Sequence, residues 1–163
     1  MMPTDSPVLI RRATGEDRDV IAELNTRLAW ETERLRLDPD RIRHGVAAVL
    51  DGRGEAFYFV AETEDGVVGQ LMLTREWSDW RNGWFYWIQS VYVRETVRQQ
   101  GVFRRLFHAA QDWVRGQDDA VGVRLYVEEH NTSAAETYAR LGLEPTGYRV
   151  METTYRHGLT PEA

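Results

Sequence analysis

The sequence contains no cysteine and no lysine, and no apolar run approaches the ~18 residues that a membrane-spanning helix needs. Without cysteine the chain offers no disulfide framework, no thiolate nucleophile and no cysteine-based metal site. Without lysine it cannot form a Schiff base with a carbonyl substrate. Its polar beginning is unlike a secretory signal. We therefore expect a cytoplasmic protein with no membrane partner.

Negative charge is in excess in this sequence. The 20 basic residues are all arginine and are outnumbered by 26 acidic residues, which gives a net charge of −6. This balance argues against nucleic acid as a partner. It either keeps the protein soluble or favours a cationic small-molecule substrate. The four histidines have no metal-ligand spacing, so we expect no metal.

The length and the order of patterns predict one α/β (α+β) domain over residues 1–163. A hairpin at Asp65-Gly66 joins two strands, and a later strand–helix–strand crossover requires parallel pairing. The sheet should therefore be mixed and mostly antiparallel, with helices on both faces. We expect strands at about 8–12, 56–63, 67–75, 84–93, 123–127 and 147–155, and helices at about 17–35, 39–50, 102–115 and 133–141.

The most informative stretch is Ser90-Val91-Tyr92-Val93, which leads into Arg98-Gln99-Gln100-Gly101-Val102-Phe103. An apolar strand ends in a polar loop, and the loop opens an amphipathic helix at Gly101. Backbone N–H groups converge at such a helix start beside the positive end of the helix dipole. This arrangement suits a phosphate-bearing ligand, although a glycine at a helix start is common without any ligand.

A second stretch places an amide and a phenol near the start of the next predicted helix. Asn131 is followed by Ala134 and Tyr138, and Ser133 with Glu136 forms a capping box. Because the capping box already satisfies the helix start, Asn131 is left to bind a ligand; the alternative is that Asn131 is itself the cap. Tyr138 is either a core residue or a proton donor.

Together these segments resemble the cofactor site of the GNAT superfamily of acyl-CoA-dependent N-acetyltransferases. The resemblance implies a GNAT fold whose sheet splays between the fourth and fifth expected strands, 84–93 and 123–127, and admits acetyl-CoA there. It implies that the backbone of the fourth strand pairs with pantetheine and that the loop amides hold the pyrophosphate. It also implies that Tyr138 protonates the departing CoA thiolate. The cofactor-binding residues would be Val91, Tyr92, Val93, Arg98, Gln99, Gln100, Gly101, Val102, Phe103, Arg104, Asn131, Ala134 and Tyr138.

Two positions depart from the family pattern. Phe103 stands where the family prefers a small residue, so it turns sideways, packs on the adenine or narrows the site. Trp87 stands where some members carry a glutamate base, and the nearby Gln89 cannot act as a base. Glu31 and Glu33 are then the best candidate bases, acting through water, and Asp79 is a further candidate. The alternative for each is an ordinary surface acid.

We also expect a binding site for the acceptor amine that is lined by acidic and aromatic side chains. Aromatic side chains beside a carboxylate hold a cationic amine, and the same cluster would also suit a core or a homodimer surface. The candidate substrate-binding residues are Asp79, Trp80, Trp87 and Gln89. We expect acetyl transfer from acetyl-CoA to a primary amine of a small molecule or peptide by direct attack. The alternative is a non-catalytic module on the same fold that binds CoA or a partner.

Overall fold

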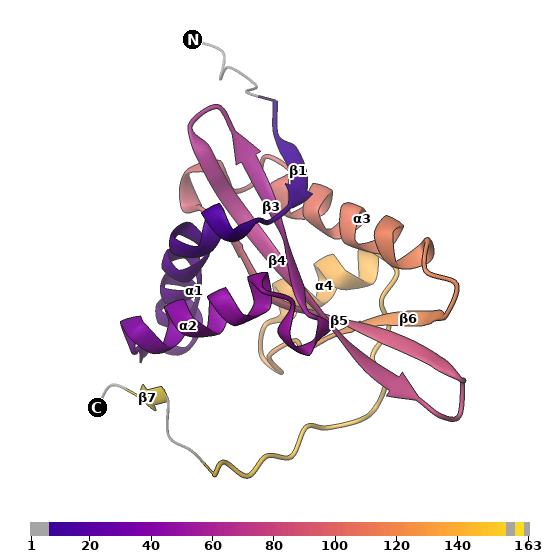
Figure 1. The fold of residues 1–163 in the computed structure, drawn as a ribbon. Coiled ribbons are helices and arrows are strands. Elements are labelled where there is room, and N and C mark those ends of the chain that lie inside the picture. Colours follow the sequence, from indigo (N-terminus) through magenta and orange to yellow (C-terminus); the bar gives the residue numbers. More distant parts are fainter. Residues whose placement is uncertain (1–6, 156–158, 162–163) are drawn as a thin grey trace.

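The computed structural model describes residues 7–155 and 159–161. A five-stranded sheet has the order β1-β3-β4-β5-β6, and a separate pair joins β2 to β7 (Figure 1). All pairs are antiparallel except β5 with β6, which is parallel. The mixed, mostly antiparallel sheet is therefore confirmed. The strands are β1 Leu9–Arg12, β2 Leu35–Leu37, β3 Phe57–Thr63, β4 Gly66–Ser78, β5 Gly83–Val93, β6 Ala120–Leu125 and β7 Leu159–Pro161.

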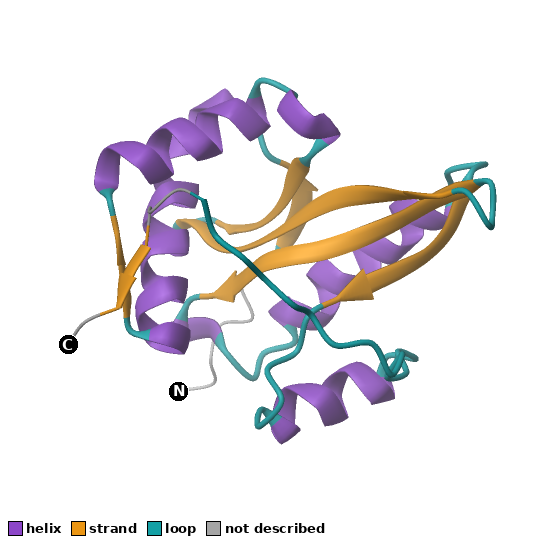
Figure 2. Cartoon of the chain, turned by 90° about the horizontal axis from the view of Figure 1, so that it is seen from below, coloured by secondary structure: helices purple, strands orange, loops and turns teal. Residues whose placement is uncertain are grey.

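Helices lie on both faces of the sheet (Figures 1 and 2). On one face, buried residues of α3 pack on alternate residues of the sheet, with Phe107 and Leu106 fully buried. On the other face, Ile21 of α1 and Val46 of α2 pack on Tyr58 and Val60 of β3. The helices are α1 Arg18–Glu33, α2 Pro39–Leu50, α3 Val102–Arg115 and α4 Thr132–Arg140, and single 3-10 turns cover Gly15–Asp17, Arg53–Glu55 and Glu95–Val97.

Local signals account for most of the helix starts. Thr14 begins the first turn in a capping box with Asp17. Asp38 caps α2 by accepting from the Arg41 N–H at 2.7 Å, with Pro39 at the first helical position. α3 spans the predicted residues 102–115.

The end of α1 differs from the prediction. Leu35 was expected on the apolar face of this helix, but α1 stops at Glu33 because Arg34 adopts a left-handed conformation with φ of 55°. The next three residues form β2, which the sequence did not indicate.

The C-terminal part differs most from the prediction. No strand forms over 147–155, and every residue from 144 to 155 is exposed. This segment follows α4 and runs below the sheet toward β7, which pairs with β2 (Figure 1). The predicted strand at 123–127 also begins earlier, at Ala120, and ends at Leu125.

Candidate active site

The candidate site begins where β5 and β6 separate. Their parallel pairing runs from Trp84 with Ala120 to Ile88 with Leu125, and no pairing to β6 follows within the described residues. β6 ends at Leu125, whereas β5 continues to Val93. The backbone edge of residues 89–93 that faces β6 is therefore open to another extended chain.

A β-bulge in β5 lies at this point. Met72 pairs with Gln89 and Gln70 with Tyr92, so two residues of β5 oppose the single residue between them on β4. Ser90 has a φ of 51°, in the left-handed region. The fully buried Gln70 donates from Nε2 to the Ser90 carbonyl at 3.1 Å, while its Oε1 has no partner. Gln70 therefore stabilises the bulge from the neighbouring strand.

The bulge changes which side chains face each helix layer. Before it, Tyr86 and Ile88 are buried in the cluster beneath α3; after it, Val91 and Val93 pack on that cluster. Tyr92 points the other way, and its hydroxyl donates to Glu31 Oε1 of α1 at 2.7 Å. The Val91 and Val93 side chains are thus core residues, and only their backbone is available at the open edge.

The loop after β5 ends at a helix start that no side chain caps. Gly101 has a φ of 76°, and a Cβ added there would meet nothing within 4 Å among the described atoms. The first N–H groups of α3 have no side-chain cap and lie at the positive end of the helix dipole. A helix start of this kind can accept a pyrophosphate. Of the other predicted loop residues, Val102 is buried and Gln99, Gln100 and Arg104 are exposed.

Two arginines tie this loop to α1. Arg98 donates from Nε to the Val93 carbonyl at 2.9 Å and pairs with Glu31 at 2.6 Å. Arg94 pairs with Glu23, two turns earlier on α1, at 2.8 Å. Hydrogen bonds from Arg94 and Arg27 lower the pKa of Glu23 to about 2. The Tyr92 hydroxyl and then Arg98 lower the pKa of Glu31.

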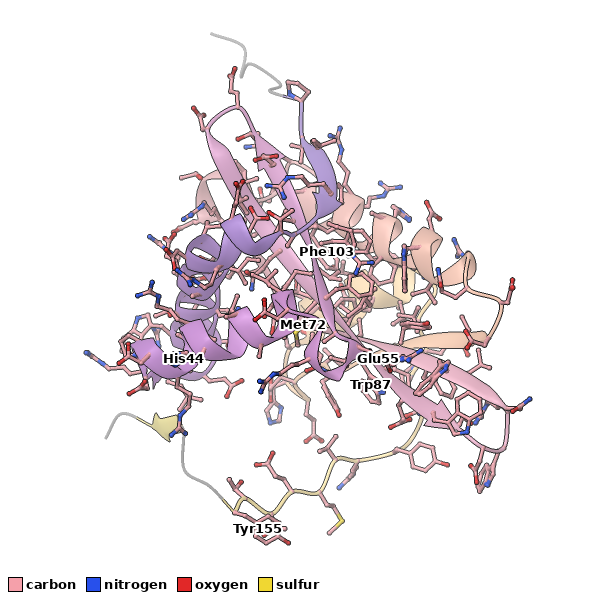
Figure 3. The ribbon with its side chains drawn as sticks, viewed as in Figure 1. His44, Glu55, Met72, Trp87, Phe103 and Tyr155 are labelled. Atoms are coloured by element: carbon pink, nitrogen blue, oxygen red, sulfur yellow. The ribbon has the colours of Figure 1, made fainter. Side chains whose placement is uncertain are left out.

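Phe103 is a half-buried residue in the first turn of α3. Its ring is 5.9 Å from the ring of Tyr138 and 6.0 Å from that of Phe107. It packs on the buried cluster beneath α3, and Figure 3 labels it near the middle of the view. These contacts agree with a ring turned sideways onto the helix surface. Burial raises the pKa of the Tyr138 phenol.

Asn131 is the N-cap of α4, which corrects the expectation that Ser133 would cap it. The Asn131 Oδ1 accepts from the Ala134 N–H at 3.1 Å. The alternative reading of Asn131 as a helix cap is therefore the observed one. Its Nδ2 makes no hydrogen bond in the described part of the chain, so it keeps two donors.

The predicted acceptor residues fall into two groups. Trp87 and Gln89 lie at the separation: Trp87 stacks on Tyr126 at 4.6 Å, and Gln89 donates to Thr74 at 2.7 Å (Figure 3). Asp79 and Trp80 lie in the turn between β4 and β5, with Trp80 86% exposed. Six extended residues separate that turn from Gln89, roughly 20 Å. The structure does not bring these two residues to the site.

Of the candidate bases, Glu31 and Glu33 lie near the end of α1. Both carboxylate oxygens of Glu31 are engaged, by Tyr92 and Arg98. Glu33 is exposed and makes no ion pair within the described residues.

Three residues that support the site from neighbouring elements were not predicted from the sequence. They are the buried Gln70 and the ion-paired Glu23 and Arg94. For Gln70 a signal existed, because a glutamine within the apolar run of β4 requires a buried partner.

A groove of about 340 Å³ lies between α1 and α2. None of the predicted site residues lines this groove, so it is not part of the candidate site. Within residues 7–155 and 159–161, no three His, Asp or Glu side chains gather as a metal site. Nor does any helix there have the length and apolar character to span a bilayer.

The mixed sheet opens between β5 and β6 beside the uncapped start of α3. Comparison with known proteins gives the family that has this fold. Residues 21–143 match the Acetyltransferase (GNAT) family, so the chain belongs to the GNAT family. A possible acetyltransferase from Clostridium difficile 630 is 43% identical and superposes with a TM-score of 0.85 over 92% of this chain and 99% of that one.

Two other solved structures share the fold at low identity. Aminoglycoside N-acetyltransferase AAC(6')-Iy in complex with CoA is 18% identical, with a TM-score of 0.75 over 96% of this chain and all of that one. Glucosamine-6-phosphate N-acetyltransferase from Arabidopsis thaliana is 16% identical, with a TM-score of 0.70 over 90% and 98% of the two chains. No curated protein matches the sequence significantly.

Proposed function

We propose that this acetyltransferase moves an acetyl group from acetyl-CoA to a primary amine of a small molecule or peptide. The observation that carries the proposal is the open backbone edge of residues 89–93 beside the uncapped start of α3. The first offers strand pairing to the pantetheine amides, and the second offers N–H donors to the pyrophosphate. Neighbours in complex with CoA support this reading.

The residues of the site have distinct parts in the proposed reaction. Bound acetyl-CoA supplies the activated acyl group. The backbone N–H near Val91 polarises the thioester carbonyl, because it belongs to the part of β5 without a β6 partner. The Tyr138 hydroxyl donates a proton to the departing sulfur, and its raised pKa keeps that proton available at neutral pH.

Acceptor deprotonation is assigned to a carboxylate acting through water near the end of α1. We favour Glu33 over Glu31 for this role. The Glu31 carboxylate already has two partners, Tyr92 and Arg98, and these contacts lower its pKa. Direct attack on the thioester then follows, because the chain has no cysteine to carry an acyl group.

Thermal unfolding with acetyl-CoA tests the cofactor site. At about 100 times its dissociation constant the ligand adds ~2.7 kcal/mol, a shift of roughly 5–10 °C for this length. Gly101→Glu should abolish the shift by placing charge beside the pyrophosphate. Gly52→Glu is the matched control, since Gly52 also has a positive φ, of 86°, and open space around it. Equal shifts in both variants would contradict the site.

Turnover tests the reaction itself. Steady release of CoA in the presence of primary amines is expected. Binding of acetyl-CoA without turnover across polyamines, amino sugars, amino acids and peptides would instead favour the non-catalytic module. This alternative is tested because Trp87 stands at the strand position where some family members carry a glutamate base.

A further inference from the structure

One face of the sheet carries a row of aromatic side chains next to the site. Tyr86 and Ile88 are buried in the cluster beneath α3, so the alternate residues of β5, Phe85 and Trp87, face the other side of the sheet. Among the described residues, neither packs in the cluster that α1 and α2 form on that side. The ends of β4 and β5 extend past both helices (Figures 1 and 2). This part of the sheet is therefore left uncovered by α1 and α2.

Two rings in this row form an exposed stacked pair. Trp87 and Tyr126, which directly follows β6, stack with ring centroids 4.6 Å apart and planes inclined by 28°. Tyr126 is 58% exposed, so much of the pair is accessible to a ligand. Phe85 continues the row: a Cβ on Gly122 would lie 2.9 Å from its ring, so the glycine leaves room for it. We call Phe85, Trp87 and Tyr126 the aromatic platform.

A cation already occupies part of the aromatic platform. The Arg124 guanidinium lies 3.6 Å from the centroid of the Phe85 ring and 5.9 Å from that of Trp87. It also pairs with Glu76 of β4 at 2.9 Å, which balances its charge. An ammonium group placed here would meet a like charge at rings that already hold a cation. An uncharged flat ring fits the same surface without this cost.

Gln89 lies between the aromatic platform and the reacting end of the site. Its Nε2 donates to the Thr74 hydroxyl at 2.7 Å, and its Oε1 has no hydrogen bond within the described residues. A fixed amide with a free oxygen can accept a hydrogen bond from an amine N–H. Two residues of strand separate Gln89 from Trp87, about 7 Å. A short alkyl chain therefore joins a ring on Trp87 to an amine at Gln89.

We propose that the acceptor is a primary amine joined by a short alkyl chain to an uncharged aromatic ring. The ring packs on the aromatic platform, and the Gln89 oxygen orients the amine toward the acetyl group at residues 89–93. This inference rests on the proposed function, because it names the acceptor class of that site. The reaction is unchanged: the amine nitrogen bonds to the acetyl carbon, the C–S bond to CoA breaks, and the amine loses one proton through water. Trp87 and Tyr126 determine specificity and take no part in proton transfer.

A matched set of acceptors tests the ring. Phenethylamine and 2-cyclohexylethylamine have the same chain and the same amine, but only the first has a flat aromatic ring. The value of kcat/KM for CoA release should be about two- to tenfold higher for phenethylamine, the usual gain of an aromatic contact beyond area burial. 1,4-Diaminobutane, whose tail is an ammonium group, should be poorer than both. Equal values for the two ring amines, or a higher value for the diamine, would overturn the proposal.

Tyr126→Ala removes the exposed member of the stacked pair. It should lower kcat/KM for phenethylamine by up to about tenfold and bring the ratio of the two ring amines close to one. This ratio does not depend on the fraction of enzyme that is active, so partial misfolding does not change it. Trp77→Ala is the matched control, because Trp77 is 46% exposed and contacts another ring, Trp84, on the α3 side of the same strands. It should keep the wild-type ratio, and a wild-type ratio in Tyr126→Ala would contradict the proposal.

Gln89→Leu tests the other end of the acceptor. The loss of the orienting oxygen should raise KM for phenethylamine and for propylamine by a similar factor, about two- to tenfold, because both share the amine and only one has the ring. An effect confined to phenethylamine, or no effect on either amine, would overturn the assignment of Gln89.

Failure of the aromatic platform and failure of the proposed function give different results. If all amines release CoA without preference for the ring, the transferase activity stands and the platform is wrong. If no amine releases CoA, the proposed function fails, and binding still tests the platform. Calorimetric titration of phenethylamine into the protein with CoA present should then give a Kd up to about tenfold weaker for Tyr126→Ala than for Trp77→Ala. Equal Kd values in the two variants would overturn the proposal.

Discussion

Individual side chains in this protein have roles that their residue type alone does not reveal. Tyr92 and Tyr138 are both phenols with a pKa raised by burial. Tyr92 donates to Glu31 and so links β5 to α1. The Tyr138 hydroxyl makes no hydrogen bond within the described residues, and its ring packs on Phe103. The contacts therefore assign a structural role to Tyr92 and leave the Tyr138 hydroxyl available for chemistry.

Tyr138→Phe should lower kcat by about 10²–10⁴-fold, the usual contribution of a general acid. Acetyl-CoA affinity and melting temperature should change little, because the ring and its contact with Phe103 remain. Steady-state kinetics and thermal unfolding on the same variant check both parts. Tyr148→Phe, at an exposed phenol, is the matched control. Near-wild-type kcat at saturating substrates would remove Tyr138 from the mechanism.

Asp17 is a buried carboxylate at the start of the first helical turn. Hydrogen bonds from Arg11 and the Thr14 N–H lower its pKa. A lowered folded-state pKa means that its stabilisation is complete above the unfolded value of about 3.9. That stabilisation is lost as the pH falls through the lower folded value.

Asp17→Asn should therefore cost about 1.5–3 kcal/mol near pH 6, the range for hydrogen bonds to a charged group. The difference from wild type should shrink below about pH 4, as the native carboxylate also becomes protonated. Urea unfolding across pH 2–7 measures it. Asp19→Asn changes an exposed ion-paired carboxylate nearby and should have the smaller effect at every pH. A difference that grows toward acid would contradict the assignment.

Among the elements, β5 determines the site because its bulge sets which groups face α1, α3 and the open edge. The buried Gln70 is the contact that holds this bulge from β4. Its Oε1 is unpartnered, so replacement by an apolar side chain removes one unfavourable group as well as one hydrogen bond. Replacing Gln70 by an apolar residue should therefore affect the melting temperature and the affinity for CoA differently.

Gln70→Leu should weaken CoA binding about tenfold and leave the melting temperature nearly unchanged. The Ser90 carbonyl loses its donor, and the open edge that would pair with pantetheine loses its fixed geometry. Calorimetric titration with CoA measures the affinity, since tenfold corresponds to ~1.4 kcal/mol. Gln117→Leu is the control, because the Gln117 amide donates to another backbone carbonyl, that of Trp113, just after the far end of α3. Wild-type affinity in Gln70→Leu would show that the bulge needs no support from β4.

The sequence predicted those elements whose signals are local. The strong apolar periodicity of 102–115 defined α3, and Asp38-Pro39 defined the start of α2. The bulge was also readable, because apolar spacing changes from Tyr86 and Ile88 to Val91 and Val93. β2 was missed because a left-handed Arg34 gives no pattern in sequence. The strand expected at 147–155 has the right composition, yet pairing depends on a partner that composition does not specify.

For the molecule as a whole, the net charge of −6 acts on both proposed substrates. Acetyl-CoA is an anion and must approach against this charge, so local N–H donors at α3 and the nearby Arg104 are needed to attract it. A cationic amine approaches with the field. The two substrates should therefore respond to salt in opposite directions.

Raising ionic strength from about 20 to 500 mM shortens the Debye length from roughly 20 Å to about 4 Å. With saturating acetyl-CoA, kcat/KM for a polyamine acceptor should fall severalfold, while that for a monoamine with a neutral tail should fall less. With saturating amine, kcat/KM for acetyl-CoA should stay level or rise. The two acceptors serve as each other's control on one enzyme preparation. If both fall equally, or the polyamine value rises, the charge of this molecule does not select a cationic acceptor.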